Sequence, residues 1–322
     1  MILWTVIAGF FTKIMDDSAN WAFPFRIAPN GATVHILGQR FEGENATAHA
    51  VNAFKSVPWF HYRSGFEPIG AGVVTSDKGW GCTIRSAQML AASALLRANA
   101  RGEKRGDIFK KFYDSKQATL SIHNIVAWAM EKGATKSYTE WFGPDLATNA
   151  IASIFQKHDD ENLFFMSVRD GAVIVSEILK IIETKPLLIS VSIRWGTDPF
   201  DSRDMKPQLL SLIALPQFAG IVGGESLFKS LFFIGGSADY LLYLDPHTTT
   251  RAFTEHAPHM EESPGPLRMS WSRLSPSMAI AFFVSTAEEF RSLQEPLSPF
   301  VSFLEEETSE EKENEDYFVI DF

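Results

Sequence analysis

The most constraining feature of this sequence is the stretch of residues 83–100, which carries apolar residues on nearly every side of a helix. Ile84 and Leu90 fall on different faces, so we expect this helix to be buried all round, ending near Gly102. A helix of this kind needs other elements packed about it. The chain has 322 residues, 45% of them hydrophobic, which is enough for one sizeable core or two lobes.

The only cysteine, Cys82, stands directly before this helix and follows the turn sequence Thr75-Ser-Asp-Lys-Gly-Trp-Gly81. A helix start offers unpaired backbone N–H groups and the positive end of the helix dipole. Both favour the thiolate, the form of cysteine that attacks carbonyl carbons. A lone cysteine is more often a small buried hydrophobe, but the glycine turn favours a nucleophile. A single cysteine also excludes an intrachain disulfide and is typical of a reducing compartment such as the cytosol.

A second polar cluster ends a predicted hairpin, residues 231–250, that turns near 235–239. If the returning strand continues to its end, Asp245 and His247 are two residues apart and project from one face. Pro246 between them favours a sheet edge or a strand exit. An ordinary strand-ending turn is the alternative, but the cysteine turn makes a carboxylate–imidazole pair the better interpretation.

These residues suit acyl transfer. His247 would take the proton of Cys82 and later protonate the leaving amine, while Asp245 would fix the imidazole tautomer. The oxyanion needs donors, and the backbone N–H of Cys82 is one. The hydroxyl of Tyr62 is a second candidate, with ordinary packing as the competing interpretation that spacing alone does not exclude.

The rest of the chain mixes short β-rich runs with helical segments, which predicts an α/β protein. The predicted strands are residues 34–38, 164–168 and 186–193, and the predicted helices are residues 46–54, 108–113, 121–132, 146–156 and 173–183.

Both ends of the chain differ from the middle. Residues 1–30 form an expected flexible arm, whose apolar start is too short to span a bilayer and lacks signal-peptide features; membrane contact is the alternative. Residues 296–322 form an expected disordered tail, because 305–316 hold eight acids and one lysine of a chain with net charge −10. The sequence has no basic cluster with interleaved aromatic residues, which argues against nucleic acid as a partner. His256 and His259 lie in a proline-rich loop and are expected to be solvated, so neither a metal nor a cofactor is predicted.

Several motifs now combine into a resemblance. They are Trp59-Phe-His-Tyr-Arg63, Thr75-Ser-Asp-Lys-Gly-Trp-Gly-Cys82, Glu140-Trp-Phe-Gly-Pro144, Gly220-Ile-Val-Gly-Gly224 and Tyr243-Leu-Asp-Pro-His-Thr-Thr249. In this order they resemble the autophagin family, the autophagy-related cysteine proteases, over roughly residues 34–293. The resemblance implies a papain-like domain over residues 31–295, with a central helix carrying Cys82, an antiparallel sheet carrying Asp245 and His247, and an auxiliary lobe near 145–205.

The resemblance also implies roles and partners. By position, Cys82, Asp245 and His247 match the catalytic triad and Tyr62 the oxyanion tyrosine. Trp141 matches a tryptophan beside the active site, and Pro216 with Gln217 the loop that covers it. Tyr317 and Ile320 in the tail resemble a short motif that binds the modifier.

The implied activity is cleavage after the C-terminal glycine of ubiquitin-like modifiers of the light-chain-3 and GABARAP type. It would process the modifier precursor and release the modifier from phosphatidylethanolamine, as a cytosolic monomer in transient contact with membranes. A protease of the ubiquitin-fold modifier, which shares a Gly-Trp-Gly-Cys and an Asp-Pro-His, is the alternative. A second alternative is a catalytically silent protein that only binds the modifier.

Overall fold

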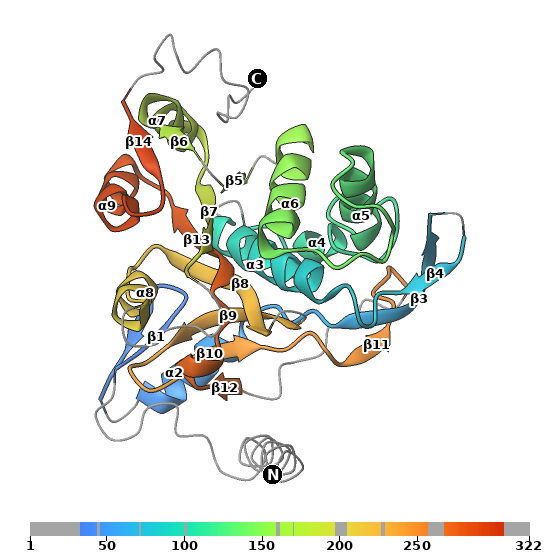
Figure 1. Cartoon of the computed structure of the whole chain (residues 1–322), viewed down its shortest axis with the longest axis horizontal. Coiled ribbons are helices and arrows are strands. Elements are labelled where there is room, and N and C mark those ends of the chain that lie inside the picture. Colours follow the sequence, from blue (N-terminus) through green and yellow to red (C-terminus); the bar gives the residue numbers. More distant parts are fainter. Residues whose placement is uncertain are drawn as a thin grey trace.

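A mixed sheet lies between two helical layers. The computed structural model describes residues 33–43, 46–70, 72–99, 102–158, 162–169, 171–196, 205–226, 229–256 and 267–305. In Figure 1, helices α3, α5 and α6 lie on one side of the sheet and α7, α8 and α9 lie on the other. The helices are α2 (Ala46–Lys55), α3 (Cys82–Ala98), α4 (Arg105–Lys110), α5 (Ile122–Glu131), α6 (Pro144–His158), α7 (Val175–Thr184), α8 (Met205–Ile213), α9 (Ala287–Leu297) and the 3-10 turn η1 (Trp271–Arg273).

The main sheet has the strand order β12-β10-β9-β8-β13-β7-β5, with β1 pairing on β9 and β2 on β1. Its strands are β1 (Val34–Ile36), β2 (Gln39–Phe41), β5 (Phe164–Val168), β7 (Leu187–Arg194), β8 (Phe218–Ser226), β9 (Lys229–Gly236), β10 (Leu241–Leu244), β12 (Leu267–Met269) and β13 (Ser277–Val284). Adjacent pairs are antiparallel except β5–β7, which is parallel. The predicted α/β class is therefore confirmed, with one parallel pair in an otherwise antiparallel sheet.

One hydrophobic core packs on each face of this sheet. Along β13, Ala279, Ala281 and Phe283 join the core under α3, while Ile280 and Phe282 join the core under α8 and α9. Side chains alternate across a strand, so one apolar strand serves both layers. Each fully buried large apolar side chain contributes about 1.5–3 kcal/mol to stability.

Helix α3 lies at the centre of the larger core. Of its 17 residues, 14 are buried, as the apolar pattern on all its sides predicted. It packs against β8 and β9 on one side and against α4 and α6 on the others. The chain enters this helix at Cys82, so the nucleophile candidate sits at one end of a rigid element.

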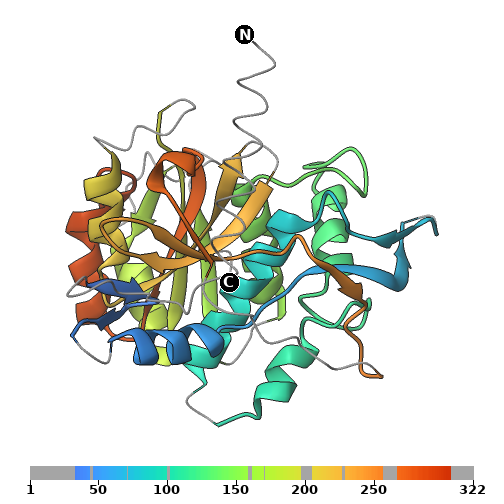
Figure 2. The ribbon, with the colours of Figure 1, turned by 90° about the horizontal axis from the view of Figure 1, so that it is seen from below.

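Two smaller sheets complete the fold. One has the order β11-β3-β4, formed by β3 (Tyr62–Ile69), β4 (Val74–Ser76) and β11 (Thr249–Arg251), and the other pairs β6 (Ala172–Ile174) with β14 (Ser302–Leu304). Figure 2 shows β3 and β4 extending outward from the body. Residues 145–205, predicted as an auxiliary lobe, contribute β5 and β7 to the main sheet, and the bounds of such a lobe stay a prediction. Among the described residues, no helix is long and apolar enough to cross a membrane.

Candidate active site

Cys82 is the first residue of α3 and is fully buried. The turn before it is built on Asp77, whose carbonyl accepts the N–H of Gly81 at 2.9 Å, while the Gly81 carbonyl accepts the N–H of Arg85 at 3.0 Å. Gly79 has a φ of +88°, a left-handed conformation that favours glycine. The glycines therefore turn the chain sharply into the helix, as the sequence indicated.

Asp245 and His247 follow β10 directly. The strand ends at Leu244, so the prediction that the strand continues to His247 is wrong. Instead the Asp245 carboxylate turns back and accepts both the main-chain N–H of His247, at 2.9 Å, and its ring Nδ1, at 2.5 Å. This is an Asx turn, a local structure that aspartate favours before proline. The carbonyl of Asp245 also accepts the indole N–H of Trp59 at 2.9 Å. The two side chains meet as predicted, but through a turn and not through strand alternation.

The thiol of Cys82 is surrounded by groups that stabilise its charged form. Burial raises the pKa of Cys82, but interactions with His247, the Ser230 main chain, Trp141 and Tyr62 outweigh burial and lower the pKa to about 7. Burial lowers the pKa of His247, but Asp245 and Cys82 outweigh burial and raise it to about 9. A thiolate beside an imidazolium is therefore favoured near neutral pH.

The ring Nε2 of His247 is the nitrogen left over from the pair with Asp245. It is buried and has no described hydrogen-bond partner at ordinary distance, although His247 and Cys82 shift each other's pKa values. Hydrogen bonding and charge attraction between the imidazole and the thiol nevertheless lower the pKa of Cys82 and raise that of His247. Catalytic hydrogen bonds are often long in enzymes without substrate and shorten when it binds.

Tyr62, the first residue of β3, lies beside both groups. Its main-chain N–H donates to the Pro246 carbonyl at 2.8 Å, and its ring meets that of His247 edge-on, 5.4 Å between centroids. Burial and the neighbouring Cys82 raise the pKa of Tyr62, so its hydroxyl keeps its proton. A protonated phenol beside the thiol is a hydrogen-bond donor of the kind an oxyanion requires.

Trp141 covers the thiol. Its indole N–H donates to Sγ of Cys82 at 3.4 Å, and its side chain is half-buried. The loop that carries it runs between α5 and α6, and Gly143 in that loop starts α6 by accepting the N–H of Ala147. The sequence-based placement of Trp141 beside Cys82 agrees with this geometry.

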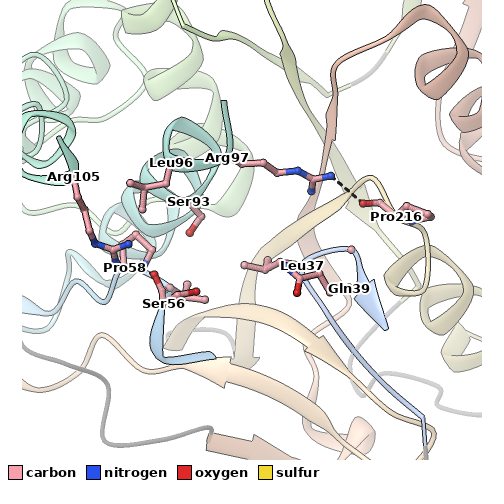
Figure 3. A pocket seen from close by; sticks show the side chains of 11 residues that line it. Leu37, Gln39, Ser56, Pro58, Ser93, Leu96, Arg97, Arg105 and Pro216 are labelled. Carbon is pink, nitrogen blue, oxygen red and sulfur yellow. Dashed lines mark hydrogen bonds between the residues drawn. The ribbon is translucent and has the colours of Figure 1, made fainter. Parts of the chain in front are cut away.

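Pro216 and Gln217 lie far from Cys82, so the prediction that they cover it does not fit the structure. The carbonyl of Pro216 accepts Nη2 of Arg97 at 3.1 Å (Figure 3), and Gln217 donates to Ser292 of α9. Arg97 is in the last turn of α3, about 22 Å along the helix from Cys82 at 1.5 Å per residue. The two residues precede β8 at one end of the sheet.

The segment that reaches the thiol is the start of β9. It does so through the main chain of Ser230, a residue that was not predicted from the sequence to belong to the site.

Tyr317 and Ile320 lie outside the described residues, as do the N-terminal arm and His259, so the predictions for them stay predictions.

A buried ion triad lies behind the cysteine turn and was not predicted. Arg85 binds Asp77 through Nε at 2.7 Å and Asp114 through Nη1 at 2.8 Å, and all three side chains are fully buried. Nη1 of Arg85 also donates to Gln88 at 3.0 Å. Burial raises the pKa of Asp77 although Arg85 opposes the shift. For Arg85, burial lowers the pKa, but Asp114 and Asp77 outweigh it and raise the pKa.

The triad joins the three segments that carry the site. Asp77 accepts the main-chain N–H of Arg63, next to Tyr62, at 2.5 Å. Asp114 accepts the N–H of Phe253, downstream of His247, at 2.7 Å. Arg85 is in the first turn of the helix that Cys82 begins. Tyr62, Cys82 and the His247 segment are thus tied to one charged cluster, which holds them in place relative to each other.

The contact between the turn and the triad makes a prediction for Gly81→Ala. A Cβ at Gly81 would meet both Cβ and Oδ2 of Asp77 at 2.6 Å, so Asp77 has to move. We expect a loss of about 1–3 kcal/mol in unfolding free energy and slower alkylation of Cys82. Gly106→Ala is the control, because nothing lies within 4 Å of its Cβ. Urea unfolding and iodoacetamide labelling test this, and equal results for the two variants would contradict it.

His61 makes a pH-dependent prediction. It is fully buried, and neither ring nitrogen has a described hydrogen-bond partner. Burial, with Arg63 and Arg85 nearby, lowers its pKa from 6.5 to about 3. The unfolded chain therefore binds more protons at this residue between pH 6.5 and 3, so the stability it provides is complete above pH 6.5 and falls as pH drops.

At pH 5 the loss of stability from His61 is about 2 kcal/mol. In His61→Phe we expect the difference in unfolding free energy between pH 7 and pH 5 to shrink by that amount. His256→Phe is the control, since His256 is exposed. An unchanged pH difference in His61→Phe would show that another group causes the acid sensitivity.

A cysteine at the start of a buried central helix, facing an antiparallel sheet, is the arrangement of the papain-like cysteine proteases. The model of the peptidase C54 catalytic domain matches residues 47–296. Cysteine protease ATG4A of Xenopus laevis is 30% identical over 308 residues, covering 80% of this chain and 76% of the relative. Probable cysteine protease atg4 of Schizosaccharomyces pombe is 29% identical over 306 residues, covering 92% and 93%. This chain belongs to the peptidase C54 family, the autophagin group of cysteine proteases.

Proposed function

We propose that this protein is an endopeptidase that cleaves the bond after the C-terminal glycine of ubiquitin-like autophagy modifiers of the light-chain-3 and GABARAP type. The observation that carries the proposal is the thiol of Cys82, with a pKa of about 7, held at a helix start among His247, Tyr62 and Trp141. The relatives named above are cysteine proteases of the same family.

The chemistry follows from these groups. His247 holds the proton of the Cys82 thiol, and the thiolate attacks the glycine carbonyl carbon. The oxyanion accepts hydrogen bonds from the Tyr62 hydroxyl and the Cys82 main-chain N–H. The imidazolium of His247, oriented by Asp245, then gives its proton to the leaving amine nitrogen and leaves a thioester on Cys82. Water, deprotonated by His247, hydrolyses the thioester and frees the glycine carboxylate.

One mechanism serves both proposed substrates, because the leaving group is an amine in each. In the precursor the amine begins the residues after glycine, and in the lipid conjugate it belongs to phosphatidylethanolamine. Trp141 over the thiol favours a glycine at the cleavage site, since any side chain there would meet the indole. We further propose that the enzyme acts as a cytosolic monomer and contacts the membrane transiently while it releases the modifier.

Gel-resolved cleavage tests the proposal. Precursors of a light-chain-3 type modifier and of the ubiquitin-fold modifier, each extended after glycine, are incubated with the wild type and with Cys82→Ser. We expect cleavage of the light-chain-3 type precursor only, and none by the variant. Cleavage of the ubiquitin-fold modifier alone would assign the other specificity, and tight binding without cleavage would make the protein a modifier-binding protein.

A further inference from the structure

A groove with an arginine at each end lies at the C-terminal end of α3, remote from Cys82. Its volume is about 380 Å³, within the range of ligand pockets. Leu37, Leu96 and Pro58 line its middle, and Arg97 and Arg105 its rim. In Figure 3 the Arg97 guanidinium lies next to Pro216 on one side of the groove, and the Arg105 guanidinium lies next to Ser56 on the other. The groove therefore offers an apolar centre between two positive charges.

The two arginines are fixed in place without a carboxylate. Arg97 donates to the Pro216 carbonyl at 3.1 Å and lies 4.6 Å over the Phe283 ring, and Arg105 donates to the Ser56 carbonyl at 2.8 Å. Neither forms an ion pair with a carboxylate of the described residues, although Glu289 acts on Arg97 electrostatically. Each guanidinium has five N–H donors, so donors remain for an acidic ligand. An elongated ligand with an acid at each end and apolar residues between fits this surface.

The C-terminal segment of the chain has an acidic residue near each end and apolar residues between them. Its last residues read Asp316-Tyr-Phe-Val-Ile-Asp-Phe322, four apolar residues between two aspartates, and they lie outside the described residues. The last described residue, Glu305, follows β14, which is linked to the segment beside Pro216 through α9. Phe303 packs on Phe290 of α9, ring centroids 6.0 Å apart, and Ser292 of the same helix binds Gln217 beside Pro216. The eleven residues that follow Glu305, up to Asp316, reach up to about 36 Å when extended.

We propose that the C-terminal segment Asp316–Asp321 docks in this groove of the same molecule. The two aspartates bind Arg97 and Arg105, and the apolar residues cover Leu37 and Leu96. Docking buries Tyr317 and Ile320, so the tail recruits the modifier only when it leaves the groove. That last consequence rests on the proposed function, whereas the docking itself does not.

The test follows loss of the tail from the full chain during chymotrypsin digestion, by intact mass. Chymotrypsin cuts after Tyr317 and Phe318 only when the segment is free. We expect the wild type to lose the tail about tenfold more slowly than Arg97→Glu with Arg105→Glu, as two partly exposed ion pairs allow, and the protection to fall at high salt. Lys180→Glu with Arg291→Glu, at exposed positions outside the groove, should keep the protection.

Substitutions in the tail provide a second test, which remains valid if the variant with Arg97→Glu and Arg105→Glu is unstable. Asp316→Asn with Asp321→Asn leaves the folded body unchanged and should lose the tail as fast as the groove variant. Asp316→Lys with Asp321→Lys should restore protection to the Arg97→Glu, Arg105→Glu protein. Equal rates for the wild type and the tail variant would overturn the proposal. Protection that rises with protein concentration would overturn it as well, because the tail would then occupy a second copy. Precursor cleavage is measured separately, so failure here leaves the proposed function intact.

Discussion

Replacing His247 by alanine is expected to lower peptide-bond hydrolysis at least about a thousandfold while slowing alkylation of Cys82 at pH 7 by about tenfold. The two effects differ because alkylation needs only the thiolate. Without His247, the largest of the interactions that lower the pKa of Cys82 is lost, so less thiolate remains at neutral pH. Hydrolysis also needs a proton donor for the leaving amine, which the variant lacks.

The pH dependence of hydrolysis and of alkylation tests the role of His247 in a second way. With pKa values of about 7 for Cys82 and about 9 for His247, the wild-type rate should rise through pH 7 and fall through pH 9. Alkylation of His247→Ala should instead rise through a single, higher pKa. His256→Ala is the control, an exposed histidine whose loss should leave both profiles unchanged. A wild-type alkylation profile in the variant would show that His247 does not act on the thiol.

Replacing Arg85 by methionine should destabilise the fold by about 3–5 kcal/mol. Removing the arginine leaves Asp77 and Asp114 fully buried and without their ion-pair partner. The carboxylates then have to take up protons or disrupt the turn before Cys82. Urea unfolding measures the loss, and slower alkylation of Cys82 in the folded variant would show that the triad also positions the thiol.

Two comparisons separate the buried triad from ordinary ion pairs. Arg169→Met breaks an exposed pair with Asp145 and should cost less than about 1 kcal/mol. Adding Asp77→Asn and Asp114→Asn to Arg85→Met removes the unpaired charges and should recover part of the lost stability. If Arg85→Met costs no more than Arg169→Met, the triad does not hold the site together.

The features that could be predicted from the sequence are those that depend on residues close together in the chain. The cysteine turn and the start of α3 follow from adjacent residues, and the burial of α3 follows from its apolar pattern. Asp245 and His247 also lie close in sequence, so they meet even though the strand ends before them. The predicted helices and strands fall within a few residues of those observed, because each carries its own periodicity.

What the sequence missed depends on contacts between distant residues. Asp114 belongs to the triad only because the fold brings its loop to Arg85 and Phe253, and no spacing indicates this. Pro216 and Gln217 precede β8, and their order along the chain gave no information on which end of α3 they approach. Ser230 reaches Cys82 through its main chain, which its side chain does not signal.

We propose that the thiolate of Cys82 attacks the carbonyl carbon of the C-terminal glycine of a light-chain-3 type modifier. It is tested most directly with a modifier whose C-terminal glycine carries an electrophile in place of the scissile bond, followed by intact mass and peptide mapping. We expect one covalent adduct, located on Cys82, absent in Cys82→Ser and formed much more slowly in His247→Ala. No adduct, or an adduct only with the ubiquitin-fold modifier, would contradict it.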